Sequence, residues 1–315
     1  MYISDRDALK YSTGLLLIFI PFIFSFFNIW SWFTEIFLFI SVFIVSRNIK
    51  PQIAALLLAL GYLGAIIGAG AGGIWQIGFS PWAGILFVVL ENKGLGLRYS
   101  MFWSLMFVVL LSGLTLIPGV KEALYPDRIQ ETVAEVFQTA KELGFIANLE
   151  QQGVPSQYFE RHLEIVVPTL IKLKPAAAGI LGMAEMGSAY LIAQLFEKTK
   201  IPLTPFSKWQ LPWYGVWVAI FGIGGYLGGD YLGLEVLKII GMNLIAVSAA
   251  LSLVLGASCL VYFLSHPKTP RYLIFVFILG LIFFFHFIIL ALIVIGLFDT
   301  VLNLRKIPEK IKEGN

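Results

Sequence analysis

The sequence has few charged residues and a single cysteine. Asp, Glu, Lys and Arg make up only 13% of its 315 residues, whereas a soluble globular domain has about 25%. So few charges cannot cover a surface that faces water. The lone Cys259 excludes an intramolecular disulfide and a thiolate cluster for zinc or for iron and sulfur. The composition therefore excludes an ordinary soluble domain.

The residue patterns of catalytic and metal sites are also missing. The three histidines, His162, His266 and His286, lie far apart and lack metal-ligand spacing. There is no Ser-His-Asp order, no pair of catalytic carboxylates and no His-Glu-x-x-His motif in the apolar segments. The formal charge of +3 reflects basic residues scattered among short loops, not a basic patch. We therefore expect no enzyme activity, no metal, no cofactor and no nucleic-acid partner.

Apolar residues make up most of the chain. They account for 58% of it, with 27 Phe and 30 Gly, and the mean hydropathy is +0.86. A helix that crosses the hydrocarbon core of a bilayer needs about 20 apolar residues. We predict an all-α transmembrane helix bundle of eight to ten spans, embedded in the lipid bilayer. The expected spans are residues 11–28, 30–46, 51–71, 74–91, 100–118, 166–196, 213–229 and 236–264, followed by an apolar run over 272–304.

Basic residues indicate the orientation of these spans. They fall in alternate short connections, of which Arg47 and Lys50 form one, and the positive-inside rule places such connections in the cytoplasm. The N-terminus is then cytoplasmic. The basic tail that begins at Arg305 belongs inside as well, which requires the run 272–304 to cross twice or to re-enter. We favour a tight pair of short helices there, in a protein of the bacterial cytoplasmic (inner) membrane with both termini cytoplasmic.

We expect three parts along the chain. Residues 1–118 form an amino-terminal group of transmembrane helices, residues 119–165 an extracytoplasmic segment, and residues 166–315 a carboxy-terminal group with a cytoplasmic tail. The outer segment contains eight acidic and four basic residues. Its apolar residues from Ile129 to Leu143 recur at helical spacing, which predicts an amphipathic helix. This helix either packs as a connection or covers a binding site as a lid.

Several polar residues fall within or beside the outer halves of the spans. An ionisable residue in a bilayer is costly and normally faces the bundle interior or a cavity. We therefore predict a polar cavity that opens outward and is lined by some of the following residues: Glu35, Gln76, Lys172, Lys174, Glu185 and Lys238. In the alternative interpretation, the lysines extend to the lipid headgroups and Glu35 caps an interfacial turn.

Small residues repeat at helical spacing in the third expected span. Gly64, Gly68 and Gly72 are four residues apart, and Ala55 and Ala59 form a separate pair upstream. Small residues on one helix face allow two helix backbones to approach closely. Tight helix packing is the expected role of these residues. An unwound substrate-binding helix is the alternative.

Two stretches carry a family resemblance. Residues 202–217 read PLTPFSKWQLPWYGVW, and the sequence GLFD at 296–299 is followed by Arg305 and Lys306. A proline-rich loop, an F-x-x-W-x-L-P signature that opens a helix, and a terminal G-L-x-D before an R-K pair resemble the YybS-like family of predicted bacterial membrane proteins. The resemblance implies a multi-pass membrane protein and supplies no catalytic residue. The amino-terminal helices are also similar in style to the substrate-binding components of energy-coupling-factor vitamin transporters.

The same two stretches contain residues suited to a membrane interface. Trp209 and Trp213, together with Pro212, predict an aromatic anchor at the start of a helix. Asp299 and Arg305 belong to a polar segment at the cytoplasmic end of the last helix. Anchoring is the expected role of these five residues. Docking of a cytoplasmic partner is the alternative.

These patterns predict a transporter-like protein that binds a small solute from the outer side, or a substrate-recognition subunit of a transporter. No nucleotide-binding motif is visible, so active transport would need a partner ATPase, another membrane partner or an ion gradient. The alternative is a membrane scaffold or envelope-biogenesis protein that recruits partners. A transporter subunit requires a polar cavity that holds Glu185 or the lysines, whereas a scaffold can bury them as ion pairs.

Overall fold

The chain folds as an assembly of helices. The computed structural model describes residues 5–26, 32–70, 79–114, 121, 124–196, 205–266, 269–270 and 272–307. Over these ranges it contains twelve α-helices, two short 3-10 helices and no strand. Four helical segments are long and apolar enough to cross a membrane: Pro51–Gly68, Ser156–Ala193, Glu235–Leu264 and Phe285–Leu302. The predicted all-α class is confirmed, while eight to ten spans and an amphipathic outer helix stay predictions.

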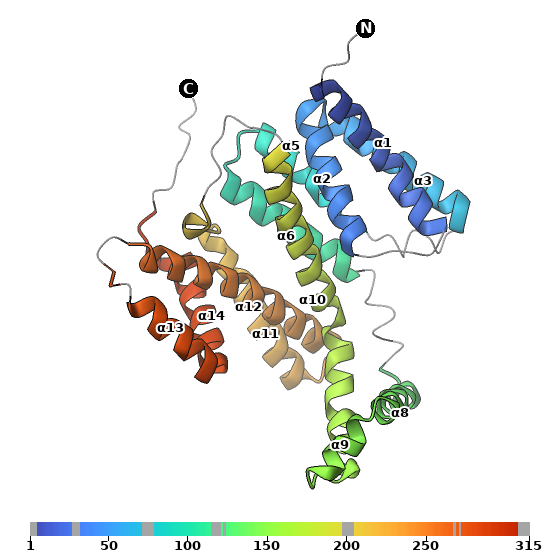
Figure 1. Cartoon of the computed structure of the whole chain (residues 1–315), viewed down its shortest axis with the longest axis vertical. Helices are drawn as coiled ribbons and strands as arrows, with labels where there is room; N and C mark the ends of the chain where they lie inside the picture. The colour runs from blue at the N-terminus through green and yellow to red at the C-terminus, as the bar shows by residue number, and fades with distance from the viewer. Residues whose placement is uncertain are drawn as a thin grey trace.

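The amino-terminal helices form one group, drawn in blue and cyan in Figure 1. Their bounds are α1 Asp5–Phe26, α2 Trp32–Asn48, α3 Pro51–Ala69, α5 Trp82–Asn92 and α6 Leu97–Leu114. α3 begins at Pro51, a position compatible with proline because the N–H groups of the first turn have no partner within the helix. α3 packs along α1, and α2 contacts both helices. Leu17, Leu38 and Leu58, one from each helix, are fully buried in a shared cluster.

A long central helix, α10, spans Ser156–Phe196 and contacts α2, α6 and α12 (Figure 1). Two short helices, α8 Pro126–Glu142 and α9 Phe145–Gln151, lie beside its beginning. There Val133 of α8 packs in a cluster with Leu163 of α10, so the apolar face of α8 is turned toward α10. The predicted boundary at residue 165 falls inside α10, since this helix joins the outer segment to the following span.

The carboxy-terminal helices are α11 Val216–Leu232, α12 Glu235–Leu264, α13 Tyr272–Phe283 and α14 Phe285–Leu302. α12 packs along both α11 and α14. The apolar run 272–304 divides at Phe284, whose φ of −125° and ψ of 36° depart from helical values. Two helices are therefore present in this run, of which α14 alone is long enough to cross a membrane, and a double crossing stays a prediction. In Figure 1 the start of α1 and the end of α10 lie at one end of the molecule, opposite α8 and α9.

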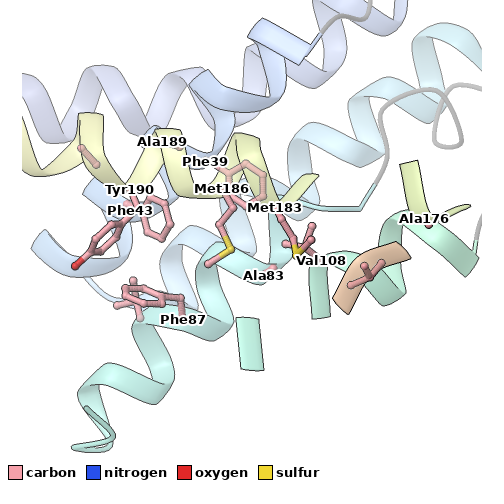
Figure 2. Close-up of a cluster of buried hydrophobic side chains, with 13 residues drawn as sticks. Phe39, Phe43, Ala83, Phe87, Val108, Ala176, Met183, Met186, Ala189 and Tyr190 are labelled. Carbon is pink, nitrogen blue, oxygen red and sulfur yellow. The ribbon is translucent and has the colours of Figure 1, made fainter. Parts of the chain in front are cut away.

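A large buried cluster lies where α2, α5, α6 and α10 meet. Phe43 contacts Phe87 and Tyr190 edge to face, with ring centroids 5.7 and 6.0 Å apart, an arrangement that aromatic rings prefer. Met186 of α10 is fully buried in the same cluster. Figure 2 shows these side chains converging, with Tyr190 beside Phe43. The cluster fixes the part of α10 that carries Glu185.

The small residues predicted to pack α3 coincide only in part with its close contacts. A very close approach occurs at Gly61, where a Cβ atom would lie 2.3 Å from the Leu17 carbonyl oxygen. At Gly64 the same test atom would lie 3.3 Å from the Phe22 ring. Of the other predicted positions, Ala55, Ala59 and Gly68 are half-buried, and Gly72 lies outside the described residues. The face of α3 that touches α1 therefore includes Gly61, which the four-residue spacing from Gly64 does not reach.

Two glycines bring the backbones of α12 and α14 together. A Cβ atom at Gly256 would lie 1.9 Å from the Leu292 carbonyl oxygen, and one at Gly296 would lie 1.9 Å from that of Ser252. Gly256→Ala must therefore push the helices apart, and we expect the free energy of unfolding to fall by about 1–3 kcal/mol. Thermal unfolding of the purified protein measures the change. Gly224→Ala is the control, because the space around Gly224 is open, and an equal loss there would contradict the prediction.

Candidate functional site

The residues predicted to line one polar cavity lie in separate places. Glu35 and Glu185 meet between α2 and α10. Lys172 and Lys238 each form an ion pair near the start of α12, and Gln76 lies outside the described residues. Among the described residues, no group of three His, Cys, Asp or Glu side chains could hold a metal ion. The structure therefore brings the two glutamates together and leaves the lysines apart from them.

The two lysine ion pairs lie at the junction of α11 and α12. Lys172 Nζ is 2.6 Å from Glu235 Oε1, and Lys238 Nζ is 2.5 Å from Asp230 Oδ1. The acidic side chains are 56% and 61% exposed, and exposed pairs of this kind contribute at most about 1 kcal/mol. Lys174 is exposed on α10. These lysines therefore belong to a charged surface.

Glu35 and Glu185 are called the acid pair below. Glu35 lies in the first turn of α2, and Glu185 lies in α10. Their carboxyl groups lie within hydrogen-bonding reach of each other, and Glu185 is only 6% exposed. Its Oε2 atom has no hydrogen-bond partner within the described part of the chain. The acid pair thus brings two acidic groups together, one of them buried, where an uncompensated charge is costly.

An open pocket of about 570 Å³, called the cavity below, lies between α3, α5 and α6. Its described lining is aromatic and aliphatic, without a charged side chain: Ala59, Tyr62, Leu63, Ile66, Phe79, Trp82, Ile85, Leu86, Val89, Phe107 and Leu111. The Tyr62 ring stacks on Phe79 with centroids 5.8 Å apart and is tilted against Trp82 at 6.2 Å. Tyr62 also lies within electrostatic range of Glu35. One residue of the cavity wall is therefore close to the acid pair.

Asn243 of α12 forms hydrogen bonds with two backbone groups of α10 beside Pro175. Its Oδ1 accepts a hydrogen bond from the Ala176 N–H at 2.7 Å, and its Nδ2 donates one to the Lys172 carbonyl at 2.8 Å. In a regular helix these two backbone groups would bond to each other. Pro175 has no N–H, and its ring crowds the preceding turn, which opens the helix. The Asn243 amide therefore bridges an opened turn of α10 and joins it to α12.

Arg305 forms a buried ion pair beyond the end of α14. Its Nη2 is 2.7 Å from Asp299 Oδ2, and the two side chains are 0% and 2% exposed. The guanidinium also donates to the carbonyls of Ser207 and Trp209 and to the Ser258 hydroxyl, each at 2.6 Å. We call these contacts the Arg305 network. It ties the end of α14 to α12 and to the loop that precedes α11.

The predicted aromatic anchor lies in that same loop. The Trp209 ring is half-buried, and its backbone carbonyl belongs to the Arg305 network. Pro212 is buried and precedes a single 3-10 turn. Trp213 is 58% exposed. Trp213 is therefore placed to contact lipid or a partner, whereas Asp299 and Arg305 are used inside the molecule.

The site residues predicted from the sequence did not include Arg47, Asn243 or Pro175. Arg47 is 3.0 Å from Glu91 in an ion pair, and its guanidinium lies 5.5 Å from the centre of the Tyr190 ring, so it joins α2, α5 and α10. In the sequence, Arg47 contributed only to the predicted orientation of the spans. A lone Asn and a Pro inside apolar segments are the signals that could have identified Asn243 and Pro175.

A set of apolar helices joined by buried polar contacts defines a helical membrane protein. Residues 13–300 match the family described as "Predicted membrane protein (DUF2232)", and the chain belongs to this family. No curated protein and no solved structure matches the chain. The family description agrees with the membrane location predicted from composition. The YybS-like name and the similarity to energy-coupling-factor components stay predictions.

Proposed function

We propose that the protein is a transporter-like component of the membrane, which binds a small solute in the cavity between α3, α5 and α6. The observation that carries this proposal is the cavity of about 570 Å³, because small-molecule sites typically enclose about 300–1,000 Å³. Its wall combines apolar side chains with two groups able to form hydrogen bonds, the Tyr62 hydroxyl and the Trp82 indole N–H. This wall suits a solute with an apolar body and one polar group.

The orientation predicted from basic residues puts this cavity toward the outer side of the membrane. Tyr62 lies twelve residues after Lys50, about 18 Å along α3, and Trp82 lies eleven residues before Lys93, about 16 Å along α5. Both lysines belong to connections that the positive-inside rule places in the cytoplasm. We therefore propose entry of the solute from outside, in an inner-membrane protein with cytoplasmic termini.

The proposed solute site is less polar than the cavity predicted from the sequence. Lys172 and Lys238 are held in ion pairs and do not contribute to the apolar wall. A charged solute would leave its charge uncompensated in that wall, which is costly. Energy for transport would come from a partner ATPase or an ion gradient, and the protein could serve such a partner as its substrate-recognition subunit.

A membrane scaffold is the second candidate function. It is favoured by the ion pairing of Lys172, Lys238 and Arg305, because polar groups joined to each other hold helices together and need no ligand. The exposed Trp213 would then belong to a surface that recruits a partner. This alternative predicts a stoichiometric protein partner and an empty cavity.

Mass spectrometry of small molecules that co-purify with the full-length protein in detergent tests the proposal. We expect a stoichiometric apolar or amphiphilic molecule, and Ala59→Trp should lower its occupancy by about tenfold, roughly 1.4 kcal/mol, because the indole occupies part of the cavity. Leu56→Trp is the matched control, since Leu56 is 61% exposed on the same helix and does not line the cavity.

Two results would contradict the solute site. One is a wild-type protein that carries no stoichiometric small molecule, and the other is unchanged occupancy in Ala59→Trp. A stoichiometric protein partner in either case would support the scaffold. Thermal unfolding of both tryptophan variants shows that any loss of the molecule comes from the filled cavity and not from misfolding.

A further inference from the structure

The acid pair differs from the ion-paired charges of the bundle. The ion pairs among the described residues give Arg47, Lys172, Lys238 and Arg305 a carboxylate within 3.0 Å. None of these ion pairs includes Glu35 or Glu185. The two glutamates contact each other instead. Their negative charge must therefore be compensated by something other than these basic side chains.

The described surroundings supply no positive charge to the acid pair. Tyr62 approaches it from α3 and is not a cation at any pH. Along α10, Lys174 is eleven residues away, about 16 Å from Glu185. Lys172 is thirteen residues from Glu185, and Arg47 is twelve residues from Glu35 along α2, so each lies about 18–20 Å away. The charged side chains of α5, α6 and α12 lie toward the far ends of α5 and α6 or at the start of α12: Glu91, Arg98, Glu235 and Lys238.

Protonation of one carboxyl group removes the repulsion between the two. Two ionised carboxylates cannot hydrogen-bond, because an ionised carboxyl group is an acceptor only. When one group is protonated, its O–H donates to an oxygen of the other, and the pair carries one negative charge instead of two. Like charges in contact disfavour double ionisation, which is why paired carboxyl groups elsewhere share one proton.

We propose that Glu35 and Glu185 together form a binding site for one proton between α2 and α10. Glu185 Oε2 is buried without a partner in the described part of the chain, so the pair also has an acceptor for a second proton. Binding the first proton halves the buried charge, and binding the second makes the pair neutral. The proton site needs no solute, but its role as a coupling site for transport rests on the proposed function.

The position of Tyr62 links the proton site to the cavity. Tyr62 is part of the cavity wall and lies within electrostatic range of Glu35. A solute that displaces water or changes a hydrogen bond at Tyr62 alters the energy of the charged pair. By linkage, proton binding must then change the affinity for that solute by the same factor. An ion gradient of protons would be the matching energy source.

Infrared spectroscopy of the full-length protein in lipid nanodiscs, titrated with acid and base, tests the proton site. The expected result at neutral pH is a C=O stretching band of a buried carboxylic acid, which shifts in deuterium oxide and disappears on titration with base. Glu185→Gln and Glu35→Gln should each abolish this band. Glu91→Gln should leave it unchanged, because Glu91 is ion-paired to Arg47 and contributes no carboxylic acid.

The outcomes separate this inference from the proposed function. Absence of the band in the wild type, or its persistence in both glutamine variants, overturns the proton site. Loss of the band when sodium chloride replaces choline chloride also overturns it, because the pair would then hold a metal cation. The titration uses no solute, so an empty cavity with an intact band would refute the solute site alone. The wild-type titration decides the question even if one variant fails to fold.

Discussion

Arg305→Met is expected to lower the free energy of unfolding by about 3–5 kcal/mol, because removal of one partner leaves a buried charge unpaired. The substitution keeps an apolar stem and removes the guanidinium, while Asp299 stays at 2% exposure. The carbonyls of Ser207 and Trp209 also lose donors that lie 2.6 Å away, and an unpaired buried acceptor adds to the loss. Denaturant unfolding of the purified full-length protein measures the change.

A matched control is available on the surface. Arg128 and Glu131 also form an ion pair at 3.0 Å, but their side chains are 71% and 61% exposed, so Arg128→Met should cost no more than about 1 kcal/mol. Adding Asp299→Leu to Arg305→Met should recover part of the loss, since no buried charge is then left alone. Similar losses for Arg305→Met and Arg128→Met would show that the Arg305 network does not stabilise the fold.

The helical membrane class was predictable because it depends on composition. An apolar segment must satisfy its own backbone hydrogen bonds in a bilayer, which favours helices whatever the order of the side chains. The break of the run 272–304 was predictable for a related reason, since its length and the basic residues after it could not both fit one span. The number of spans is a finer property. It depends on how segments tilt and pack, which apolar composition does not specify.

The pairing of the charged residues was much harder to predict from the sequence. Glu35 and the α10 lysines have similar depths by residue count, yet Glu35 meets Glu185, eleven residues beyond Lys174. Depth along a helix says nothing about rotation around its axis or about the crossing angle of two helices. Lys172 pairs with Glu235 on α12. The two residues are more than sixty positions apart in the sequence, so local spacing does not predict their ion pair.

The Arg305 network shows a second limit of spacing arguments. Residues six apart do not face each other on a helix, so Asp299 and Arg305 would not be paired by helical periodicity. The chain reverses between them at Asn303, which has a φ of 46° and ends α14. Asparagine adopts this left-handed conformation more readily than most residues. An asparagine after a long apolar helix was the available signal for the turn.

The opened turn of α10 gives the other large expected effect. Asn243→Leu removes the acceptor for the Ala176 N–H and a donor to the Lys172 carbonyl. An unsatisfied buried group costs about 1–3 kcal/mol, so we expect the free energy of unfolding to fall by roughly 2–6 kcal/mol for the two groups together. Denaturant unfolding measures this loss.

A double-mutant cycle with Pro175→Ala tests the reason for that loss. Without the proline ring, α10 can close, and the Ala176 N–H can bond directly to the Lys172 carbonyl as in a regular helix. Asn243→Leu should therefore cost at least about 1 kcal/mol less in the Pro175→Ala background than in the wild type, a coupling typical of residues that share partners. Additive losses would mean that the Asn243 amide stabilises α12 or the α10–α12 contact in some other way, and not by completing the backbone of α10.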